Sequence, residues 1–466
     1  TTEIYTLSLH DALPISLARH GVEILSTGGT AKALRDAGLS VKDVSEHTGF
    51  PEMMDGRVKT LHPKVHGGLL ALRDNKEHMA AASTHGIGMI DLVCVNLYPF
   101  ERTVAKPGVE RHEAIEQIDI GGPSMVRSAA KNHGFVAILT DPAQYAEVMA
   151  EMDLTGGATS MATRRKLAVA AYRATAAYDT AISTWLARHE AGEAEFTPTR
   201  VLRFNLRESL RYGENPHQSA AFYADPEWQG ASLASARQVS GKELSYNNIL
   251  DMDAALRLVM EFEEPAAVVV KHTNPCGCAI GGSIGEAFVR AYEGDPLSAF
   301  GGIVALNRPC DAATARAMCE GGKFLECVVA PGFDAEGIEQ LVEKNPNKWK
   351  KSIRLVDVGA LTVGHPVPDM RTVTGGVLIQ SRDTQHVRAG DLKLPTKAKP
   401  DDAMMRELLF AWSVVKHIKS NAICLTKGRQ LLGAGAGQMS RVDSVEIALK
   451  KAGIHAKGAA LASDAF

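Results

Sequence analysis

The stretch VEILSTGGTAKALRDAG, residues 22–38, decides how the first part of the chain folds. It opens with the apolar run VEIL, continues through the turn STGGT at 26–30, and then shows a helical pattern that closes on Gly38. A short apolar run before a glycine turn is typical of a strand, and a glycine directly after a helical pattern is a common C-terminal cap. The stretch therefore predicts a strand, a tight turn and a helix in that order.

The same alternation continues through the first part of the chain. Strand-like apolar runs recur at 91–100 and 135–140, and a long helical pattern follows that includes Tyr178 among its apolar positions. Strands that alternate with helices favour a parallel α/β sheet. The polar run EAGEAEFTPTR at 190–200 comes next, and we place a domain boundary near 191–200.

The second part of the chain again alternates. Its apolar runs rich in β-branched residues predict buried strands: AAVVVKH (266–272), FGGIVALN (300–307), ECVVAPGF (326–333) and NAICLTK (421–427). Two stretches, which begin at residues 268 and 423, each predict a strand, a glycine-rich turn and a helix. This pattern indicates two similar halves.

Length and composition exclude several classes of protein. A chain of 466 residues predicts two or three domains. Lys plus Arg is 51 and Asp plus Glu is 54, and a net charge of −3 argues against a binder of nucleic acid or of anionic membranes. No apolar run reaches the roughly 18 to 20 residues of a membrane helix. The seven cysteines are scattered and odd in number, which favours a reducing cytoplasm over a disulfide framework.

Three segments of the first part gather groups that suit an anionic substrate. STGGT could hold a phosphate at a helix N-terminus, although a tight turn without a ligand has the same pattern. DGRVKTLHPKVHGGLL at 55–70 crowds cationic side chains and histidines beside a proline and two glycines, and its alternative is a solvated basic loop. IDIGGPSMVRSAAKNH places Asp119 ahead of Arg127 and Lys131. We expect this carboxylate and the two cations to meet at a strand end.

Lys271 and His272 end a strand-like run in the second part. We expect them at the carboxyl edge of that strand, where α/β sheets usually bind ligands. A histidine there can exchange a proton near neutral pH, and a lysine can stabilise a developing oxyanion. A purely structural pair is the alternative.

Cys276 and Cys278 invite comparison with zinc deaminases, which combine a histidine, a glutamate and two cysteines around an activated water. Here the spacing is C-x-C after KHTNP, without the C-x-x-C and H-x-E of those enzymes. We therefore expect no zinc and no metal ligands at these cysteines, and we prefer two buried thiols.

The motifs of the two parts occur in a specific order: STGGT, DGRVKTLHPKVHGG, NLYPF, IDIGGPSMVRSAAKNH, RYGENPHQ, ELSYNN, VVVKHTNPCG, SAFGGIVALN and GAGAGQMSR. Together they closely resemble the bifunctional purine biosynthesis family that joins phosphoribosylaminoimidazolecarboxamide (AICAR) formyltransferase to inosine monophosphate (IMP) cyclohydrolase. The resemblance spans about residues 17–466. It implies that a formyl group passes from 10-formyltetrahydrofolate to AICAR, and that formyl-AICAR then closes to IMP with loss of water.

The resemblance also implies the domain organisation. Residues 17–195 would form the cyclohydrolase domain, an α/β domain with a methylglyoxal synthase-like parallel sheet. Residues 196–466 would form the formyltransferase domain, two cytidine deaminase-like α/β units without zinc. Because the family's formyltransferase sites are similar to interface sites built from two subunits, we expect a homodimer. A monovalent cation is a further ligand that the family allows.

For the cyclohydrolase site, the family's motifs carry over residue by residue. Lys59 and Tyr98 would polarise the carbonyl oxygen of the formyl group, while Asp119 and Lys131 would manage protons and the departure of water. Nucleotide binding would fall to Ser26, Thr27, Gly28, Gly29, Arg57, Thr60 and Asn96.

For the formyltransferase site, the resemblance assigns catalysis to Lys271, His272 and Asn421. His272 would take the proton of the AICAR amine, Lys271 would stabilise the oxyanion or assist proton transfer to the folate nitrogen, and Asn421 would position the formyl group. The pocket, with its folate side, would be shaped by Arg211, Tyr212, Asn248, Phe300, Gly301, Glu326 and Arg441.

Both ends depart from the family's pattern. Residues 1–16 show no strand or helix period and Pro14 interrupts them, so we expect a foreign segment in place of the family's opening strand and S-D-K-T-G-type phosphate loop. The chain stops at LASDAF, ahead of the family's last folate-pocket and phosphate-binding residues. We therefore expect both sites to be incomplete. Two alternatives follow, a catalytically silent nucleotide-binding fragment and a zinc-dependent nucleotide deaminase.

Overall fold

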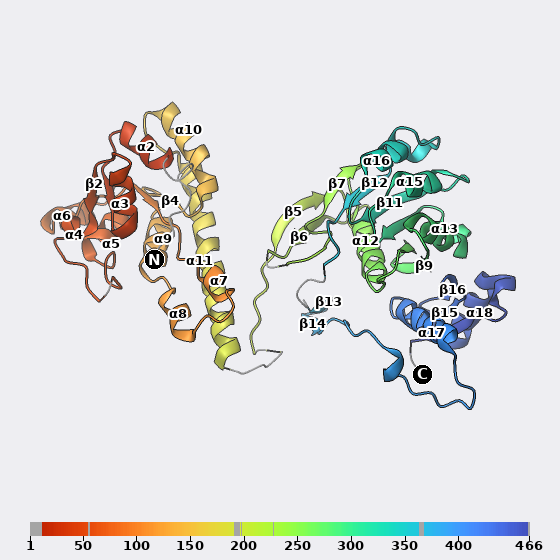
Figure 1. The fold of residues 1–466 in the computed structure, drawn as a ribbon. Helices are drawn as coiled ribbons and strands as arrows, with labels where there is room; N and C mark the ends of the chain where they lie inside the picture. Colours follow the sequence, from red (N-terminus) through yellow and green to blue (C-terminus); the bar gives the residue numbers. More distant parts are fainter. Residues whose placement is uncertain are drawn as a thin grey trace. The chain divides into compact units, whose positions relative to one another are not determined.

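The computed structural model describes residues 12–54, 56–190, 196, 198–226, 228–362 and 368–464. The chain divides into two compact units, Thr1–Leu202 and Arg203–Phe466 (Figure 1). The division therefore falls directly after the polar run 190–200.

Unit 1 contains short parallel strands. β1 (Ile24–Ser26) pairs with β2 (Val41–Asp43), and β3 (Leu92–Cys94) pairs with β4 (Ala137–Leu139), both in parallel. This confirms the expectation of parallel pairing in the first part of the chain. β4 is buried along its whole length, as the apolar run at 135–140 predicts.

Helices surround these strands. The core of unit 1 is formed by β3, β4 and the inner faces of several helices, among them Val126, Leu139 and Ala171. The helices of unit 1 are α2 (Ala12–Arg19), α3 (Gly28–Asp36), α4 (Val44–Thr48), α5 (Pro63–Leu70), α6 (Lys76–Thr84), α7 (Phe100–Val104), α8 (Arg111–Glu116), α9 (Gly121–Lys131), η1 (Pro142–Gln144), α10 (Tyr145–Thr155) and α11 (Met161–Glu190).

The first described residues show that Pro14 does not interrupt regular structure, contrary to expectation. The segment 1–16 lies in part outside the described residues, but residues 12–16 form the first turns of α2. Pro14 does not break this helix, because a proline in the first turn gives up an N–H group that has no partner there in any case. Leu13 is 1% exposed and packs in the core of unit 1. The described end of the segment is therefore an integral part of this unit.

Unit 2 is built on a mixed six-stranded sheet in the order β7-β12-β11-β10-β8-β9. β10, β11 and β12 run parallel to one another, whereas β8, β9 and β7 are antiparallel to their neighbours. The strands of this sheet are β7 (Arg237–Ser240), β8 (Ala266–Lys271), β9 (Asn274–Ile280), β10 (Gly302–Leu306), β11 (Leu325–Ala330) and β12 (Arg354–Asp357). The sequence predicted buried strands here but not their directions.

Helices cover both faces of this sheet (Figure 1). Along β8, Val268 and Val270 pack in a core with α12 (Tyr246–Val259) and α17 (Asp402–Val415). Ala267 and Val269 pack in the opposite core with α13 (Ile284–Gly294) and α15 (Ala312–Cys319). Successive side chains of a strand point to opposite faces, so burial of both faces explains why the whole run is apolar.

The remaining elements of unit 2 complete a smaller sheet and two hairpins. β16-β15-β17 is a three-stranded antiparallel sheet, and β5 pairs with β6 and β13 with β14, also antiparallel. The bounds are β5 (Asn205–Leu210), β6 (Ala220–Ala224), α14 (Pro296–Ala299), α16 (Ala335–Val342), η2 (Lys348–Lys351), β13 (Asp369–Val373), β14 (Gly376–Gln380), η3 (Ala389–Asp391), β15 (Ile423–Thr426), β16 (Leu431–Gly435), α18 (Arg441–Ala452), η4 (Gly453–Ala456) and β17 (Ala460–Ser463).

Unit 2 contains two halves of the same order, helix, hairpin, helix and third strand. In the first half these are α12, β8-β9, α13 and β10, and in the second they are α17, β15-β16, α18 and β17. In both, the first hairpin strand lies between the other two and is antiparallel to each. The prediction of two similar halves is confirmed at the level of topology.

The prediction of a glycine-rich turn in each half is confirmed in part. Gly281 and Gly282 lie in the turn between β9 and α13, and Gly437 follows β16, but Gly277 and Gly435 lie in the second hairpin strand. A Cβ placed on Gly277 of β9 would lie 2.0 Å from the Ala291 carbonyl oxygen of α13. A Cβ on Gly435 of β16 would lie 1.9 Å from the Ser444 carbonyl oxygen of α18. The glycines therefore allow each helix to lie directly on its strand, a close approach that sequence reasoning took for a turn.

Cys276 and Cys278 lie on β9 and face the two different cores. Both are buried, at 8% and 0% exposure, which confirms the expectation of buried thiols. Burial raises the pKa of the Cys276 thiol to about 12, so it stays protonated at neutral pH.

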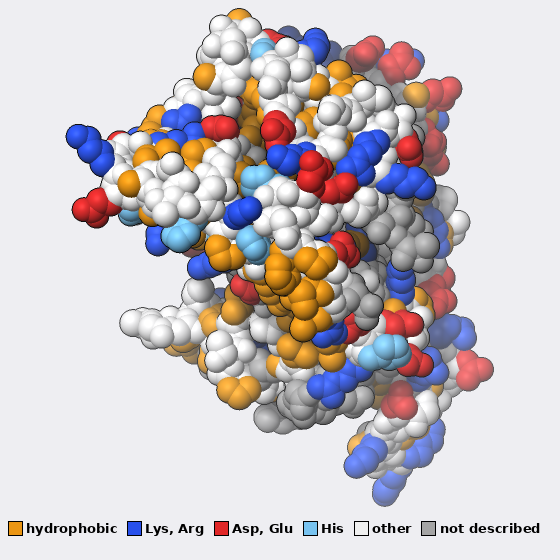
Figure 2. Space-filling model, turned by 90° about the vertical axis from the view of Figure 1, so that its left-hand side faces the viewer, with side chains coloured by type: hydrophobic (Ala, Val, Ile, Leu, Met, Phe, Trp, Pro, Cys, Tyr) orange, Lys and Arg blue, Asp and Glu red, His pale blue; other side chains and the backbone are white. Residues whose placement is uncertain are grey.

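Charge is mixed over the surface. Figure 2 shows a face on which Lys and Arg side chains are interspersed with Asp and Glu side chains, with smaller apolar clusters between them. This agrees with the balance of 51 basic and 54 acidic residues. Among the described residues, no helix combines the length and the apolar character needed to cross a bilayer.

We predict that Gly435→Ala destabilises unit 2 by more than about 2 kcal/mol, because the new methyl group overlaps the Ser444 carbonyl oxygen and α18 has to move. Urea unfolding measures the change. Gly390→Ala is the matched control, since a Cβ at Gly390 meets nothing within 4 Å. Equal stability of the two variants would contradict the close contact of α18 with β16.

Candidate active sites

Several predicted segments of unit 1 come together in space. The turn before α3 lies beside the basic segment, since a Cβ placed on Gly28 would be 3.8 Å from Lys59 Nζ. The next residue, Thr60, lies against the start of α9, because a Cβ on Gly121 would be 2.6 Å from Thr60 Oγ1. The phosphate-like turn, the basic segment and the IDIGG segment therefore form one cluster.

Asp119 lies at the start of α9 in this cluster. Its carboxylate accepts the backbone N–H of Gly122 at 2.9 Å, and the Tyr98 backbone N–H also donates to it. A Cβ on Gly122 would lie 2.3 Å from Asp119 Oδ2, so glycine is required there. Burial raises the pKa of Asp119, and the two backbone hydrogen bonds oppose this rise. A carboxyl group with a raised pKa is suited to proton transfer.

Tyr178 is a supporting residue whose role sequence reasoning missed. The helical pattern places it among the apolar positions of α11, and it is indeed buried at 8% exposure. Its hydroxyl, however, accepts the Asp119 N–H at 2.8 Å and donates to the Gln117 carbonyl at 3.0 Å. No spacing signal separates such a tyrosine from a core residue, because its partners lie about 60 residues away in the chain.

The other predicted residues of this site have more open surroundings. Lys59 Nζ is 2.9 Å from Glu52 Oε1, and Arg57 forms an exposed ion pair with Glu116. Tyr98 is 51% exposed. The remaining residues are Ser26 at the end of β1, Thr27 as the N-cap of α3, Gly29 in its first turn, and Asn96, which hydrogen-bonds to Tyr145.

Lys131 is the predicted residue that the fold does not bring beside Asp119. It is the last residue of α9, ten positions after Gly121. At about 1.5 Å per residue, this amounts to about 15 Å along the helix axis. Arg127, between them, stacks on the Tyr172 ring with its guanidinium carbon 5.5 Å from the ring centroid. The expected meeting of one carboxylate and two cations is therefore not seen.

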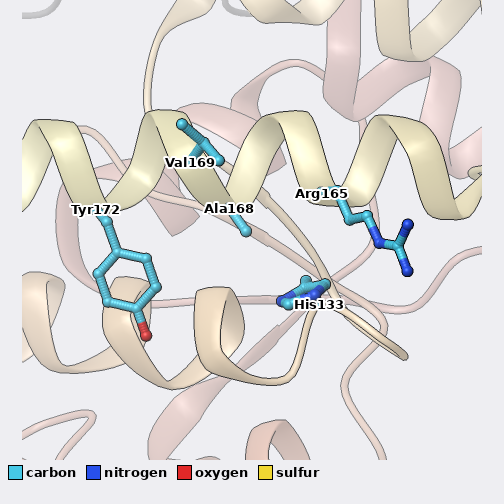
Figure 3. A pocket seen from close by; sticks show the side chains of 5 residues that line it. All are labelled: His133, Arg165, Ala168, Val169 and Tyr172. Carbon is cyan, nitrogen blue, oxygen red and sulfur yellow. The ribbon is translucent and has the colours of Figure 1, made fainter.

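A cavity of about 330 Å³ lies near the far end of α9 (Figure 3). Arg165, Ala168, Val169 and Tyr172 line it from α11, and His133 faces them from the turn after α9. It contains none of the predicted site residues of unit 1. The cluster around Asp119 is therefore separate from this cavity.

In unit 2, Lys271 and His272 lie at the tip of the β8-β9 hairpin. Lys271 Nζ donates to the Phe300 carbonyl at 2.7 Å. Gly301 follows with φ of +71°, a conformation that favours glycine, and a Cβ there would lie 3.9 Å from Lys271 Nζ. The predicted pair and the predicted Phe300–Gly301 loop are therefore neighbours.

The start of α12 forms the next side of this site. Asn248 and Ser245 make a capping box, in which each side chain accepts the backbone N–H of the other. The Asn248 amide also donates to Glu326 at 3.5 Å, and Arg354 lies 3.4 Å from the same carboxylate. Asp251 lies one turn further along α12 and accepts the His272 and Thr273 N–H groups.

Arg211 and Tyr212 join this group through Glu243. The Arg211 guanidinium lies 5.8 Å from the centroid of the Tyr212 ring and its Nε is 3.6 Å from the Glu243 carboxylate. The Glu243 backbone carbonyl accepts a hydrogen bond from Arg354 at 2.9 Å. Arg354 thereby connects the predicted arginine and tyrosine to the Asn248 side of the site.

Asn421 and Arg441 form a second cluster. Arg441 donates to Asn421 Oδ1 at 2.9 Å and pairs with Asp464 at 2.5 Å, while the Asn421 amide donates to the Gln438 carbonyl at 3.0 Å. The orientation of the Asn421 amide is thus fixed on both sides.

One hydrogen bond connects this cluster with the hairpin tip. The Lys419 N–H donates to Asn274 Oδ1 at 2.9 Å. Asn274 follows the Lys271–His272 pair by two residues, and Lys419 precedes Asn421 by two residues. The two halves of unit 2 therefore contribute to one continuous region.

Comparison with known proteins identifies relatives of both units. The family model described as AICARFT/IMPCHase bienzyme matches residues 129–451, and the MGS-like domain matches residues 13–124. A bifunctional purine biosynthesis protein PurH from Roseobacter denitrificans is 54% identical over 98% of this chain and 86% of its own length. The PurH proteins of Magnetococcus marinus and Bacillus mycoides are 53% and 51% identical, each over 97% of this chain and 86% of the relative. Among solved structures, the crystal structure of ForH is 36% identical, with a TM-score of 0.35, and covers 38% of this chain and 89% of its own.

We predict that Tyr178→Phe lowers the free energy of unfolding by about 1 kcal/mol, because the buried N–H of Asp119 and carbonyl of Gln117 lose their partner. Urea unfolding measures the change. Tyr172→Phe, on the same helix, is the control, since Tyr172 is 40% exposed and the stacking of Arg127 on its ring is kept. A loss of equal size in both variants would contradict a specific role of the Tyr178 hydroxyl.

Proposed function

The chain belongs to the AICARFT/IMPCHase bienzyme family and catalyses the last two steps of IMP biosynthesis, and we propose which of its residues perform each step. The main evidence for this activity is the sequence identity of 51–54% to PurH proteins over 97–98% of the chain. A catalytically silent fragment and a zinc-dependent deaminase are not favoured by relatives of this identity.

The first step transfers a formyl group to the 5-amino group of AICAR, and we take 10-formyltetrahydrofolate as its donor. The amine is a weak nucleophile, because its lone pair is delocalised towards the carboxamide. His272, exposed at the hairpin tip, is the general base that takes the amine proton as the nitrogen attacks the formyl carbon. The position of His272 beside Lys271 supports this role.

Lys271 is the residue that stabilises the oxyanion formed at the formyl carbon. Its hydrogen bond to the Phe300 carbonyl holds the ammonium group at the edge of the pocket. A fixed cation needs little reorganisation when the negative charge develops, which is the source of its catalytic effect. Lys271 can then pass a proton to the departing folate nitrogen.

The residues around this pair bind the substrates. Asn248, Glu326, Phe300 and Gly301 lie next to the hairpin tip and shape the AICAR pocket, to which Arg211 and Tyr212 contribute a cation and an aromatic face. Asn421 orients the formyl group. Arg441, which fixes the Asn421 amide, lies on the folate side.

The second step closes formyl-AICAR to IMP in unit 1. The carboxamide nitrogen attacks the formyl carbon, and Lys59 and Tyr98 polarise the formyl oxygen. Asp119, with its raised pKa, carries the proton that the departing water requires. The contact of Lys59 with the turn at Gly28 supports a nucleotide phosphate held by residues 26–29 together with Arg57, Thr60 and Asn96. A role of Lys131 in proton transfer stays a prediction, since the length of α9 separates it from Asp119.

We also propose that the two halves of unit 2 are cytidine deaminase-like units and that the protein is a homodimer. The shared order of helix, hairpin, helix and third strand supports the first proposal. The β13-β14 hairpin supports the second, since Val373 and Leu378, which the register places on the same face, are 48% and 62% exposed. A cluster of exposed apolar side chains is typical of a surface that another chain covers.

We predict that His272→Ala abolishes formyl transfer to AICAR and leaves the cyclisation of formyl-AICAR largely unchanged, because the two sites lie in different units. A folate-coupled assay measures the first activity, and IMP formation from formyl-AICAR measures the second. The matched control is His455→Ala, an exposed histidine on η4. Formyl transfer at the parental rate in His272→Ala would defeat the assignment.

The opposite pattern is expected for Lys59→Met, which removes the cation beside Gly28 while keeping most of the length of the side chain. Cyclisation should fall by about 100-fold, formyl transfer should continue, and formyl-AICAR should accumulate. Chromatography of the reaction mixture measures this. Lys32→Met, an exposed lysine on α3, serves as control, and an unchanged cyclisation rate in Lys59→Met would remove Lys59 from the mechanism.

A further inference from the structure

The hairpin that carries His272 closes with an unfavourable turn. Lys271 of β8 pairs with Asn274 of β9, and the two residues between them, His272 and Thr273, have φ of 52° and 60°. Two positive φ values in a two-residue hairpin loop are typical of a type I′ turn, for which asparagine and glycine are preferred. A threonine with positive φ is a genuine outlier, because its branched Cβ crowds the backbone. The turn is therefore strained at the residue next to the proposed general base.

A single carboxylate from another element holds this turn. Asp251 of α12 accepts the Thr273 N–H at 2.6 Å and the His272 N–H at 3.3 Å. Strained backbone conformations persist only where the surroundings fix them. Among the described residues, these two hydrogen bonds to Asp251 are the only ones between α12 and the turn.

The other side of the turn is also fixed, but by local groups. The His272 carbonyl accepts the Thr273 hydroxyl at 2.7 Å and the Asn274 amide at 2.9 Å. Both donors belong to the hairpin, and Asn274 is itself held from the second half, since its Oδ1 accepts the Lys419 N–H at 2.9 Å. Asp251 is the group that connects the turn to a helix.

The helix concerned is the one that shapes the substrate pocket. Asn248, which contacts Glu326, lies three residues before Asp251, so both side chains lie on the same side of α12. No salt bridge to Asp251 is found among the described residues, and its carboxylate oxygens accept the two N–H groups of the turn. The same carboxylate also has an electrostatic interaction with the His272 side chain. The capping box at Ser245 fixes the start of the helix.

We propose that Asp251 is a positioning residue for formyl transfer, which holds the His272–Thr273 turn in its left-handed conformation and so places the His272 imidazole relative to the AICAR pocket. Asp251 acts through the backbone of His272 and not on the reacting atoms. The inference rests on the role proposed above for His272.

The test compares Asp251→Ala, alone and combined with Thr273→Gly, with the parent in formyl transfer. Asp251→Ala should lower kcat by about 100-fold with little change in the KM for AICAR, because the imidazole is displaced while the pocket remains. Glycine adopts positive φ without strain, so adding Thr273→Gly should restore most of kcat. Thr273→Gly alone should stay near the parental rate.

The controls separate positioning from loss of structure. Cyclisation by unit 1 and the thermal unfolding profile report on folding of the same protein. Asp253→Ala, on the same helix, removes a carboxylate that pairs with Arg257 at 2.7 Å, and its formyl transfer should be unchanged. Asp251→Asn keeps an acceptor oxygen, so its kcat should lie between those of the parent and Asp251→Ala. Asp251→Asn also replaces Asp251→Ala as the test variant if the alanine variant does not fold.

The outcomes distinguish the two proposals. If His272→Ala is inactive while Asp251→Ala and Asp251→Asn keep the parental kcat, the positioning role is overturned and the role of His272 stands. A loss in Asp251→Ala that Thr273→Gly does not relieve also overturns it, since the carboxylate then acts in some way other than through the turn. If His272→Ala remains active, the proposed function of the pair fails, whatever the Asp251 variants do.

Discussion

Unit 2 depends on the burial of β8 on both of its faces. Its side chains alternate between the core shared with α12 and α17 and the core shared with α13 and α15. β8 is paired on both edges and packed on both faces, so it cannot shift without breaking these contacts. The hairpin tip is therefore held in one place. Helix α17 belongs to the second half of the unit but packs in the same core as β8. The two halves are therefore one folding unit, and the tip lies where both contribute.

This rigidity explains how function can be placed on an unfavourable turn. The Lys271 ammonium is held by the Phe300 carbonyl, and the backbone of the next two residues is held by Asp251. Strain at a functional site is sustained by the packing around it. In unit 1 the same principle appears in a different form, since Asp119 at the start of a helix is kept in position by the hydroxyl of Tyr178 and by the N–H of Gly122. In both units a helix-borne side chain supports a reacting group through its backbone.

Much of the candidate sites could be predicted from the sequence, because their motifs are long and lie at the ends of elements. The Lys271–His272 pair follows from its position at a strand end, and the resemblance to the family implies the Phe300–Gly301 loop and the Asn421–Arg441 cluster. The supporting residues could not be predicted. Tyr178 lies in an apolar helical pattern, and Asp251 lies in an ordinary amphipathic helix. Their partners are distant in sequence, so no local sequence pattern predicts these contacts.

The sequence by itself determined the alternation of strands and helices, the two units and the repeated halves of the second. These follow from local periodicity and composition, which each segment contains in full. Only the tertiary structure decided which glycines lie in a strand, such as Gly277 and Gly435, and which lie in a turn, such as Gly282, because a glycine in a turn and a glycine beneath a helix look alike in sequence. It also decided that Lys131 is about 15 Å along α9 from the start of that helix, and that Asp251 reaches the turn at His272. Such relations depend on how elements pack, and packing is a property of contacts between segments far apart in the chain.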